Sequence, residues 1–157
     1  MALKPEFEPV AREALKKLPL FGGCGDDQIA ALAGRMTGPR EVAAGKIIMM
    51  DQEIGKTLYI LTKGLVSIWK RVGGEKKKLA TLPAPNFFGE RTMFEESPAS
   101  ASVKADEACT LYLLERSEFY QVATLFPRMS ELIHINMDAV RAQRMGPVRP
   151  VSDEPAS

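Results

Sequence analysis

The sequence predicts an α+β fold in which helices at both ends of the chain flank a central run of short β-strands. Three observations support this. Near both ends, apolar residues recur every three or four positions, the period of an amphipathic helix. Between them, β-rich segments are separated by Gly and Pro turns about every 8–12 residues, as in a sandwich or barrel-like pair of sheets. The 157 residues, 45% hydrophobic and 26% charged, suit one globular domain, which we place at residues 1–145.

The N-terminal part, residues 1–37, is expected to be helical. Apolar side chains follow helical spacing from Phe7 to Leu18, and Pro19 ends this first helix because proline has no amide hydrogen to continue it. A glycine-rich loop separates it from a second helix with Ile29 on its apolar face.

The strands are expected within residues 38–115. Gly73 and Gly74 form a tight turn between two of them, and Pro83 and Pro85 interrupt the strand pattern. About eight strands are anticipated. The recognisable segments are 40–42, 46–50, 57–62, 65–70, 78–82, 102–104 and 110–114.

The C-terminal part, residues 116–145, is again helical. A short helix around Phe119 is followed by Pro127, which suits the first turn of a second helix. An apolar stripe then begins at Met129. The proline-containing tail, residues 146–157, is expected to be disordered.

Charge and composition restrict the partners and the compartment. The formal net charge of +1 gives no basis for a nucleic-acid-binding face. The basic run 76–78 beside Gly74 is either an exposed hairpin tip or a phosphate-binding patch, and charge runs usually mark exposed turns. No apolar run approaches the length of about 20 residues that a membrane span needs. Neither a signal peptide nor a cysteine pair is seen, so Cys24 and Cys109 are expected as reduced thiols in a cytoplasmic protein.

Enzyme chemistry finds little support. His134 is the one histidine, within the C-terminal helix, whereas a β-roll metalloenzyme needs a cluster of histidines with a carboxylate. Ser100 and Ser102 have no histidine base nearby in the sequence. We therefore expect no catalytic residues and no metal.

The stretch from 87 to 105, FFGERTMFEESPASASVKA, has the features of an anion-binding loop. Gly89 permits a tight bend, and the Glu90 carboxylate can accept hydrogen bonds from vicinal hydroxyls such as those of a ribose. Residues 91–94 can form a short helical turn whose amides favour a phosphate. After Pro98, small residues let a ligand approach the backbone.

This stretch resembles the phosphate-binding cassette of the cyclic nucleotide-binding domain family, at Phe88-Gly89-Glu90 and at Pro98-Ala99-Ser100-Ala101-Ser102-Val103. Similarity extends over about residues 15–145. The resemblance implies an antiparallel β-roll of the double-stranded jelly-roll type with flanking helices. It also implies a stand-alone regulatory or sensor domain that binds cAMP or cGMP and signals through its C-terminal helices. The ligand-binding residues would be Phe88, Gly89, Glu90, Arg91, Thr92, Ala99, Ser100 and Ser102.

The cassette departs from the family at one position, because Ala99 stands where the family has an arginine that pairs with the cyclic phosphate. Losing such a charge-assisted bond should weaken binding about 10- to 100-fold or more. Either the amides of residues 91–92, the hydroxyls of Ser100 and Ser102 and the charge of Arg91 still hold a phosphate, or the domain binds no nucleotide and is a protein-interaction scaffold. Glu90 is correspondingly a ribose ligand or a structural ion-pair or helix-cap residue.

The C-terminal helix offers a second candidate surface. In the family, the helix after the roll closes over the nucleotide base or pairs with a second subunit. Ile135 lies off the main apolar stripe, so a lid or a homodimer contact through Leu132, Ile135 and Ala139 is one expectation, and packing on the roll is the other. No helix-turn-helix, membrane or kinase segment is recognised, so an effect would pass to a protein partner by non-covalent contact.

Overall fold

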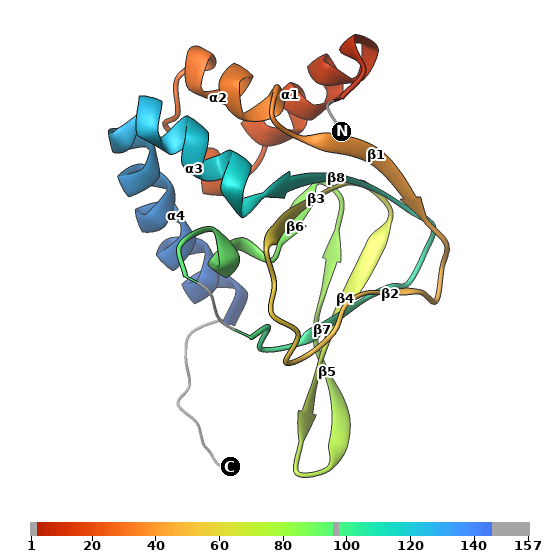
Figure 1. Cartoon of the computed structure of the whole chain (residues 1–157). Coiled ribbons are helices and arrows are strands. Elements are labelled where there is room, and N and C mark those ends of the chain that lie inside the picture. The colour runs from red at the N-terminus through yellow and green to blue at the C-terminus, as the bar shows by residue number, and fades with distance from the viewer. Residues whose placement is uncertain (1–2, 96–97, 146–157) are drawn as a thin grey trace.

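The computed structural model describes residues 3–95 and 98–145, and within them it shows eight antiparallel strands in two four-stranded sheets (Figure 1). The first sheet has the order β1-β8-β3-β6 and the second the order β2-β7-β4-β5. The predicted antiparallel β-roll with flanking helices is thereby confirmed. The strands are β1 (Thr37–Val42), β2 (Ile47–Met49), β3 (Thr57–Lys63), β4 (Leu65–Val72), β5 (Glu75–Pro83), β6 (Asn86–Phe88), β7 (Ser102–Ala105) and β8 (Cys109–Glu115).

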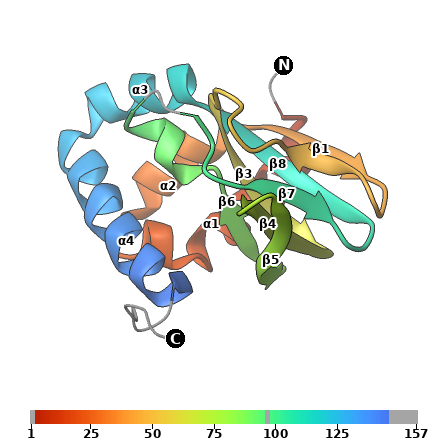
Figure 2. The same cartoon turned by 90° about the horizontal axis from the view of Figure 1, so that it is seen from below.

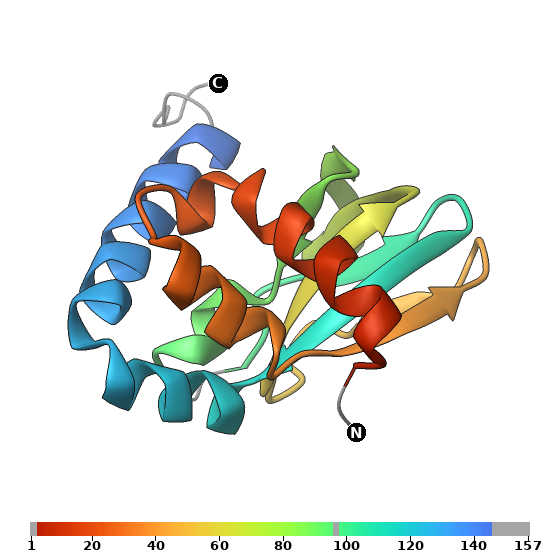
Figure 3. The ribbon, with the colours of Figure 1, turned by 90° about the horizontal axis from the view of Figure 1, so that it is seen from above.

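The helices gather on one side of the roll. Seen from below, α3 and α4 form the outer border of the helical side (Figure 2), and from above α1 and α2 lie side by side (Figure 3). Pro127 opens α4 as expected. The predicted disordered tail lies outside the described residues. The helices are α1 (Glu8–Lys16), α2 (Asp26–Ala33), α3 (Arg116–Leu125) and α4 (Pro127–Met145), with 3₁₀ turns η1 (Pro5–Phe7), η2 (Pro19–Phe21) and η3 (Glu90–Met93).

Strand β6 is not predicted from the sequence, because Pro83 and Pro85 before it indicate a break in the strand pattern. β6 pairs antiparallel with β3, placing Phe88 opposite Tyr59. Successive side chains of a strand point to opposite faces. Phe87 therefore packs among the helices, while Phe88 packs inside the roll. The turn η3 begins directly after this short strand, with Gly89 between them.

The two central strands of the first sheet, β3 and β8, are buried on both faces. In β3, Leu58 and Ile60 belong to the cluster that packs against the helices, whereas Leu61 belongs to the cluster inside the roll. In β8, Tyr112 likewise packs against the helices, and Leu111 packs inside the roll. Burial on both faces explains why these strands are almost continuously apolar. These strands therefore pack against the helices with one face and against the interior of the roll with the other.

The β4–β5 hairpin projects away from the helices (Figure 1). Its turn is formed by Gly73 and Gly74, both with positive φ, between the paired residues Val72 and Glu75. The three lysines at 76–78 are exposed on β5. The predicted exposed hairpin is therefore confirmed.

Candidate functional site

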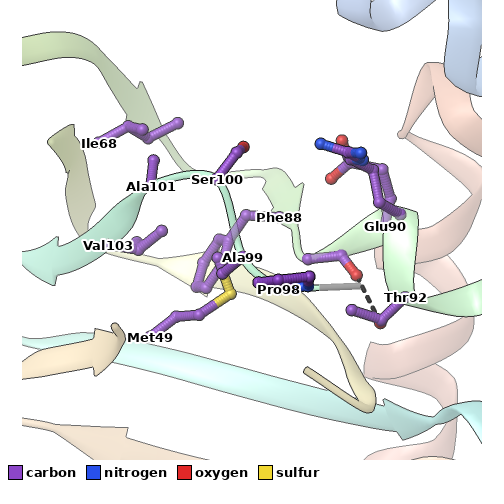
Figure 4. Close-up of a pocket in the computed structure, with 12 residues that line it drawn as sticks. Met49, Ile68, Phe88, Glu90, Thr92, Pro98, Ala99, Ser100, Ala101 and Val103 are labelled. Atoms are coloured by element: carbon purple, nitrogen blue, oxygen red, sulfur yellow. Dashed lines mark hydrogen bonds between the residues drawn. The ribbon is translucent and has the colours of Figure 1, made fainter. Parts of the chain in front are cut away.

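A pocket of about 120 Å³ opens where the second sheet meets the segment that follows β6. It contains all but one of the residues that the sequence predicted as ligand-binding (Figure 4). The two halves of the predicted cassette, residues 88–92 and 98–101, meet around it. The pocket is lined by Met49, Ile68, Phe88, Gly89, Glu90, Arg91, Thr92, Pro98, Ala99, Ser100, Ala101 and Val103.

Gly89 forms the bend that joins β6 to η3. Its φ of 81° lies in the left-handed region, which side chains disfavour. A Cβ atom at this position would also come within 2.6 Å of the carbonyl oxygen of Thr57 in β3. Both the backbone conformation and the close approach therefore require glycine here.

The turn η3 is held closed by Thr92. Its hydroxyl donates to the Gly89 carbonyl at 2.8 Å (dashed in Figure 4), and its amide points to the same oxygen at 3.3 Å. The Thr92 amide, expected to face a phosphate, is thus directed into the turn. Gly55 lies against the other side of Thr92, and a Cβ on Gly55 would be 2.7 Å from Thr92 Cγ2. Thr92 is a structural residue of the pocket wall.

The second half of the cassette is fixed to the loop between β2 and β3. The Ala99 amide donates to the Glu53 carbonyl at 2.7 Å, and the Ala99 carbonyl accepts from the Gln52 amide at 2.8 Å. These bonds use the polar backbone groups of Ala99, whose side chain brings only a methyl group to the pocket. Ser100, the next residue, is exposed and lines the opening.

Ser102 is the predicted site residue that the structure does not bring into the pocket. It begins β7, in which Val103 faces the pocket and, by alternation, Ser102 faces the other side. The Ser102 hydroxyl accepts a hydrogen bond from the Asp51 amide at 2.8 Å. Its role in this structure is to tie β7 to the β2–β3 loop.

The floor of the pocket is apolar, and of its residues Met49 and Ile68 were not predicted. Met49 in β2 and Ile68 in β4 contribute to it, along with Phe88, whose ring stacks on Tyr59 at 4.9 Å between centroids. In Figure 4, the Glu90 carboxylate lies apart from the apolar side chains of Met49 and Ile68. An apolar cleft with a few polar groups is the usual form of a small-molecule site. Burial raises the pKa of Tyr59 above its ordinary value of 10.0.

Two charged residues of η3 lie in the pocket wall. Glu90 is 8% exposed, and a carboxylate so deeply placed requires polar partners. Arg91 contacts Glu95, with 3.3 Å between Nη2 and Oε1 and with 38% and 58% of the two side chains exposed. The predicted cation at Arg91 is thus present at the pocket and is engaged with a neighbouring acid.

A second cavity, of about 170 Å³, lies between η3 and α4. Arg91 lines it as well as the first pocket. His134, exposed on α4, forms a T-shaped ring pair with Phe94, with 4.8 Å between the centroids. The remaining lining residues are Glu95, Met137, Asp138 and Arg141.

The helix α4 packs mainly on the N-terminal segment. The Asn136 amide donates to the carbonyls of Leu20 and Gly22 at 3.1 and 2.9 Å, and Leu132 lies against Gly23. Leu132 therefore takes part in internal packing, whereas Ile135 is 65% exposed. Ala139 is also exposed. None of the described residues that line the first pocket belongs to α4, so a lid or dimer role for this helix stays a prediction.

Within residues 3–95 and 98–145, no helix combines the length and the apolar character needed to cross a bilayer. The same residues contain no cluster of three or more His, Cys, Asp or Glu side chains that could hold a metal ion.

Comparison with known proteins adds to this geometry. A family model described as "Cyclic nucleotide-binding domain" matches residues 39–124. The "Cyclic AMP receptor protein" of Thermus thermophilus is 30% identical over 132 residues, which cover 83% of this chain and 59% of that protein. Mouse "Potassium/sodium hyperpolarization-activated cyclic nucleotide-gated channel 2" is 29% identical over 119 residues, covering 75% of this chain and 13% of the channel. The chain thus spans less than two thirds of the length of either relative.

A solved cyclic nucleotide-binding domain from Methylobacillus flagellatus has the same fold. It superposes with a TM-score of 0.75 at 21% identity and covers 88% of this chain and 78% of its own.

Proposed function

We propose that this chain, which belongs to the cyclic nucleotide-binding domain family, is a regulatory domain that holds cAMP or cGMP in the pocket beside Glu90. The observation that carries the proposal is the meeting of the two cassette halves, residues 88–92 and 98–101, around one cavity with an apolar floor. The names of the curated relatives, a cyclic AMP receptor and cyclic nucleotide-gated channels, support the same class of ligand.

Each side of the pocket suits one part of a cyclic nucleotide. The Glu90 carboxylate would accept a hydrogen bond from a ribose hydroxyl. The Ser100 hydroxyl and the Arg91 guanidinium would donate to the cyclic phosphate, and Gly89 would let it approach the backbone. Met49 and Ile68 offer apolar surface to the remainder of the ligand. Ligand binding would favour one arrangement of α4 relative to the cassette and so pass the signal on.

The partner would be another protein or a second copy of the chain, contacted through the exposed side of α4 that carries Ile135. The proposed compartment is the cytoplasm, since Cys24 and Cys109 are both free thiols.

A second function, a scaffold that binds no nucleotide, is favoured by one observation. The position of the family's phosphate-binding arginine holds only the Ala99 methyl group, which offers no charge to an anion. A weak or absent affinity for cyclic nucleotides would follow if no other cation replaced it.

Thermal unfolding in the presence of cAMP or cGMP separates the two functions. A ligand that binds only the folded state raises the melting temperature by mass action. We expect a rise at millimolar nucleotide for the native chain and a larger one for Ala99→Arg. Ala44→Arg, which adds the same charge at an exposed turn, is the matched control and should behave as the native chain. An unchanged melting temperature for both the native chain and Ala99→Arg would contradict the proposal and favour the scaffold function.

A further inference from the structure

We propose that Arg91 supplies the positive charge that Ala99 lacks, by exchanging its partner Glu95 for the phosphate when a cyclic nucleotide binds. This inference rests on the proposed function. It assigns the positive charge that pairs with the phosphate to η3 instead of to position 99. Among the described residues that line the pocket, Arg91 is the one cation. It adjoins Glu90, so ribose and phosphate would be recognised by consecutive residues of η3.

The relative strengths of the two contacts favour the exchange. The pair of Arg91 with Glu95 is substantially exposed, and such pairs typically change an equilibrium constant by a factor of about five or less. A charge-assisted bond to phosphate in a pocket is worth about 10- to 100-fold. Glu95 therefore competes with the ligand for Arg91, but only weakly.

The exchange would also link the pocket to α4. Arg91 and Glu95 share the second cavity with the α4 residues His134, Asp138 and Arg141. Once Arg91 turns to the phosphate, Glu95 loses its cation and has Arg141 as an alternative on the opposite wall. Ligand occupancy is thereby converted into a change of charge pairing between residues 91–95 and α4, although none of the described residues of α4 lines the first pocket.

The test is a double-mutant cycle with cAMP and cGMP, measured by calorimetric titration of the full chain. Arg91→Gln should weaken binding about tenfold or more, and Arg91→Lys, which keeps the charge, should fall between it and the native chain. Glu95→Gln should tighten binding about two- to fivefold, because it removes the competitor. In the double variant the Glu95→Gln gain should disappear. Such opposite signs would not arise from a general loss of folding.

A matched control is Arg35→Gln, which removes the same charge from an exposed pair with Glu118 at 3.1 Å. It should leave both affinities unchanged. If Arg91→Gln binds as tightly as Arg35→Gln, the assignment of Arg91 is overturned while the nucleotide pocket stands. If only Ala99→Arg binds nucleotide, Arg91 does not supply the charge, and again only this inference fails. If no variant binds either nucleotide, the proposed function fails and the inference with it.

Discussion

A Cβ atom on Gly89 would lie 2.6 Å from the carbonyl oxygen of Thr57. This contact sets how closely η3 can follow β6 while the chain stays against β3. Because the backbone of Thr57 is fixed by pairing with β8, it cannot easily move away. The position of the cassette relative to the first sheet therefore depends on the absence of a side chain at Gly89.

Gly89→Ala is expected to destabilise the fold and to weaken nucleotide binding. Gly74→Ala is the matched control, since Gly74 has a similar φ of 85° but no atom within 4 Å of its ideal Cβ position. The control should lose about 1–2 kcal/mol from its unfolding free energy through backbone strain alone. Gly89→Ala should lose about 1–3 kcal/mol more, the usual range for overpacking. Urea unfolding measures both, and equal losses would show that the contact with Thr57 carries no strain.

Removing the Thr92 hydroxyl should loosen η3. Thr92→Val keeps the shape of the side chain but removes the 2.8 Å bond to the Gly89 carbonyl, at an expected loss of about 0.5–1.5 kcal/mol in unfolding free energy. Thr81→Val, on the exposed part of β5, should stay within about 0.5 kcal/mol of the native value. The bond is not a stabilising element of the turn if chemical unfolding gives the two variants the same midpoint.

Contact between Glu90 and the ribose can be tested from both sides. The native chain should bind 2′-deoxy-cAMP about tenfold or more weakly than cAMP, because a hydrogen bond to a charged group is lost. In Glu90→Gln this discrimination should largely vanish, whereas Glu107→Gln, at an exposed position, should retain it. Calorimetric titration measures the two ratios. Undiminished discrimination in Glu90→Gln would leave Glu90 with a structural role only.

Stability should decrease at alkaline pH. Burial raises the pKa of Cys24 and Cys109 above 9.0 and that of Tyr59 and Tyr112 above 10.0. The unfolded chain therefore loses these protons at lower pH than the folded chain. The stabilising contribution is complete below about pH 9 and is lost progressively as the pH rises above it. The urea midpoint should fall between pH 8 and pH 10.5, and a constant midpoint would contradict the burial of these groups.

The first half of the cassette can be recognised in the sequence because its features are local. The bend at Gly89 and the turn from Glu90 depend on residues adjacent in the chain. The apolar floor could not be found in the same way, since Met49 and Ile68 reach the pocket from strands far apart in the sequence. Ser102 was predicted to line the pocket, but its side chain lies on the opposite face of β7. The face on which it lies depends on where β7 begins, which residue type alone does not reveal.

In the fold as well, features set by neighbouring residues could be predicted, whereas features set by contacts between distant residues could not. The turn at Gly73 and Gly74 and the start of α4 at Pro127 were predictable from residue type. Strand β6 was missed because its pairing with β3 overrides the prolines that precede it. The packing of Leu132 against the N-terminal segment likewise depends on a contact that helical periodicity does not reveal.

The most direct test of the nucleotide pocket is an NMR titration of the ¹⁵N-labelled full chain with cAMP, and in parallel with cGMP. The account predicts that amide shifts concentrate at residues 89–92 and 98–101 and saturate with one ligand per chain. Unchanged spectra at millimolar nucleotide, or shifts confined to residues outside these two segments, would contradict it.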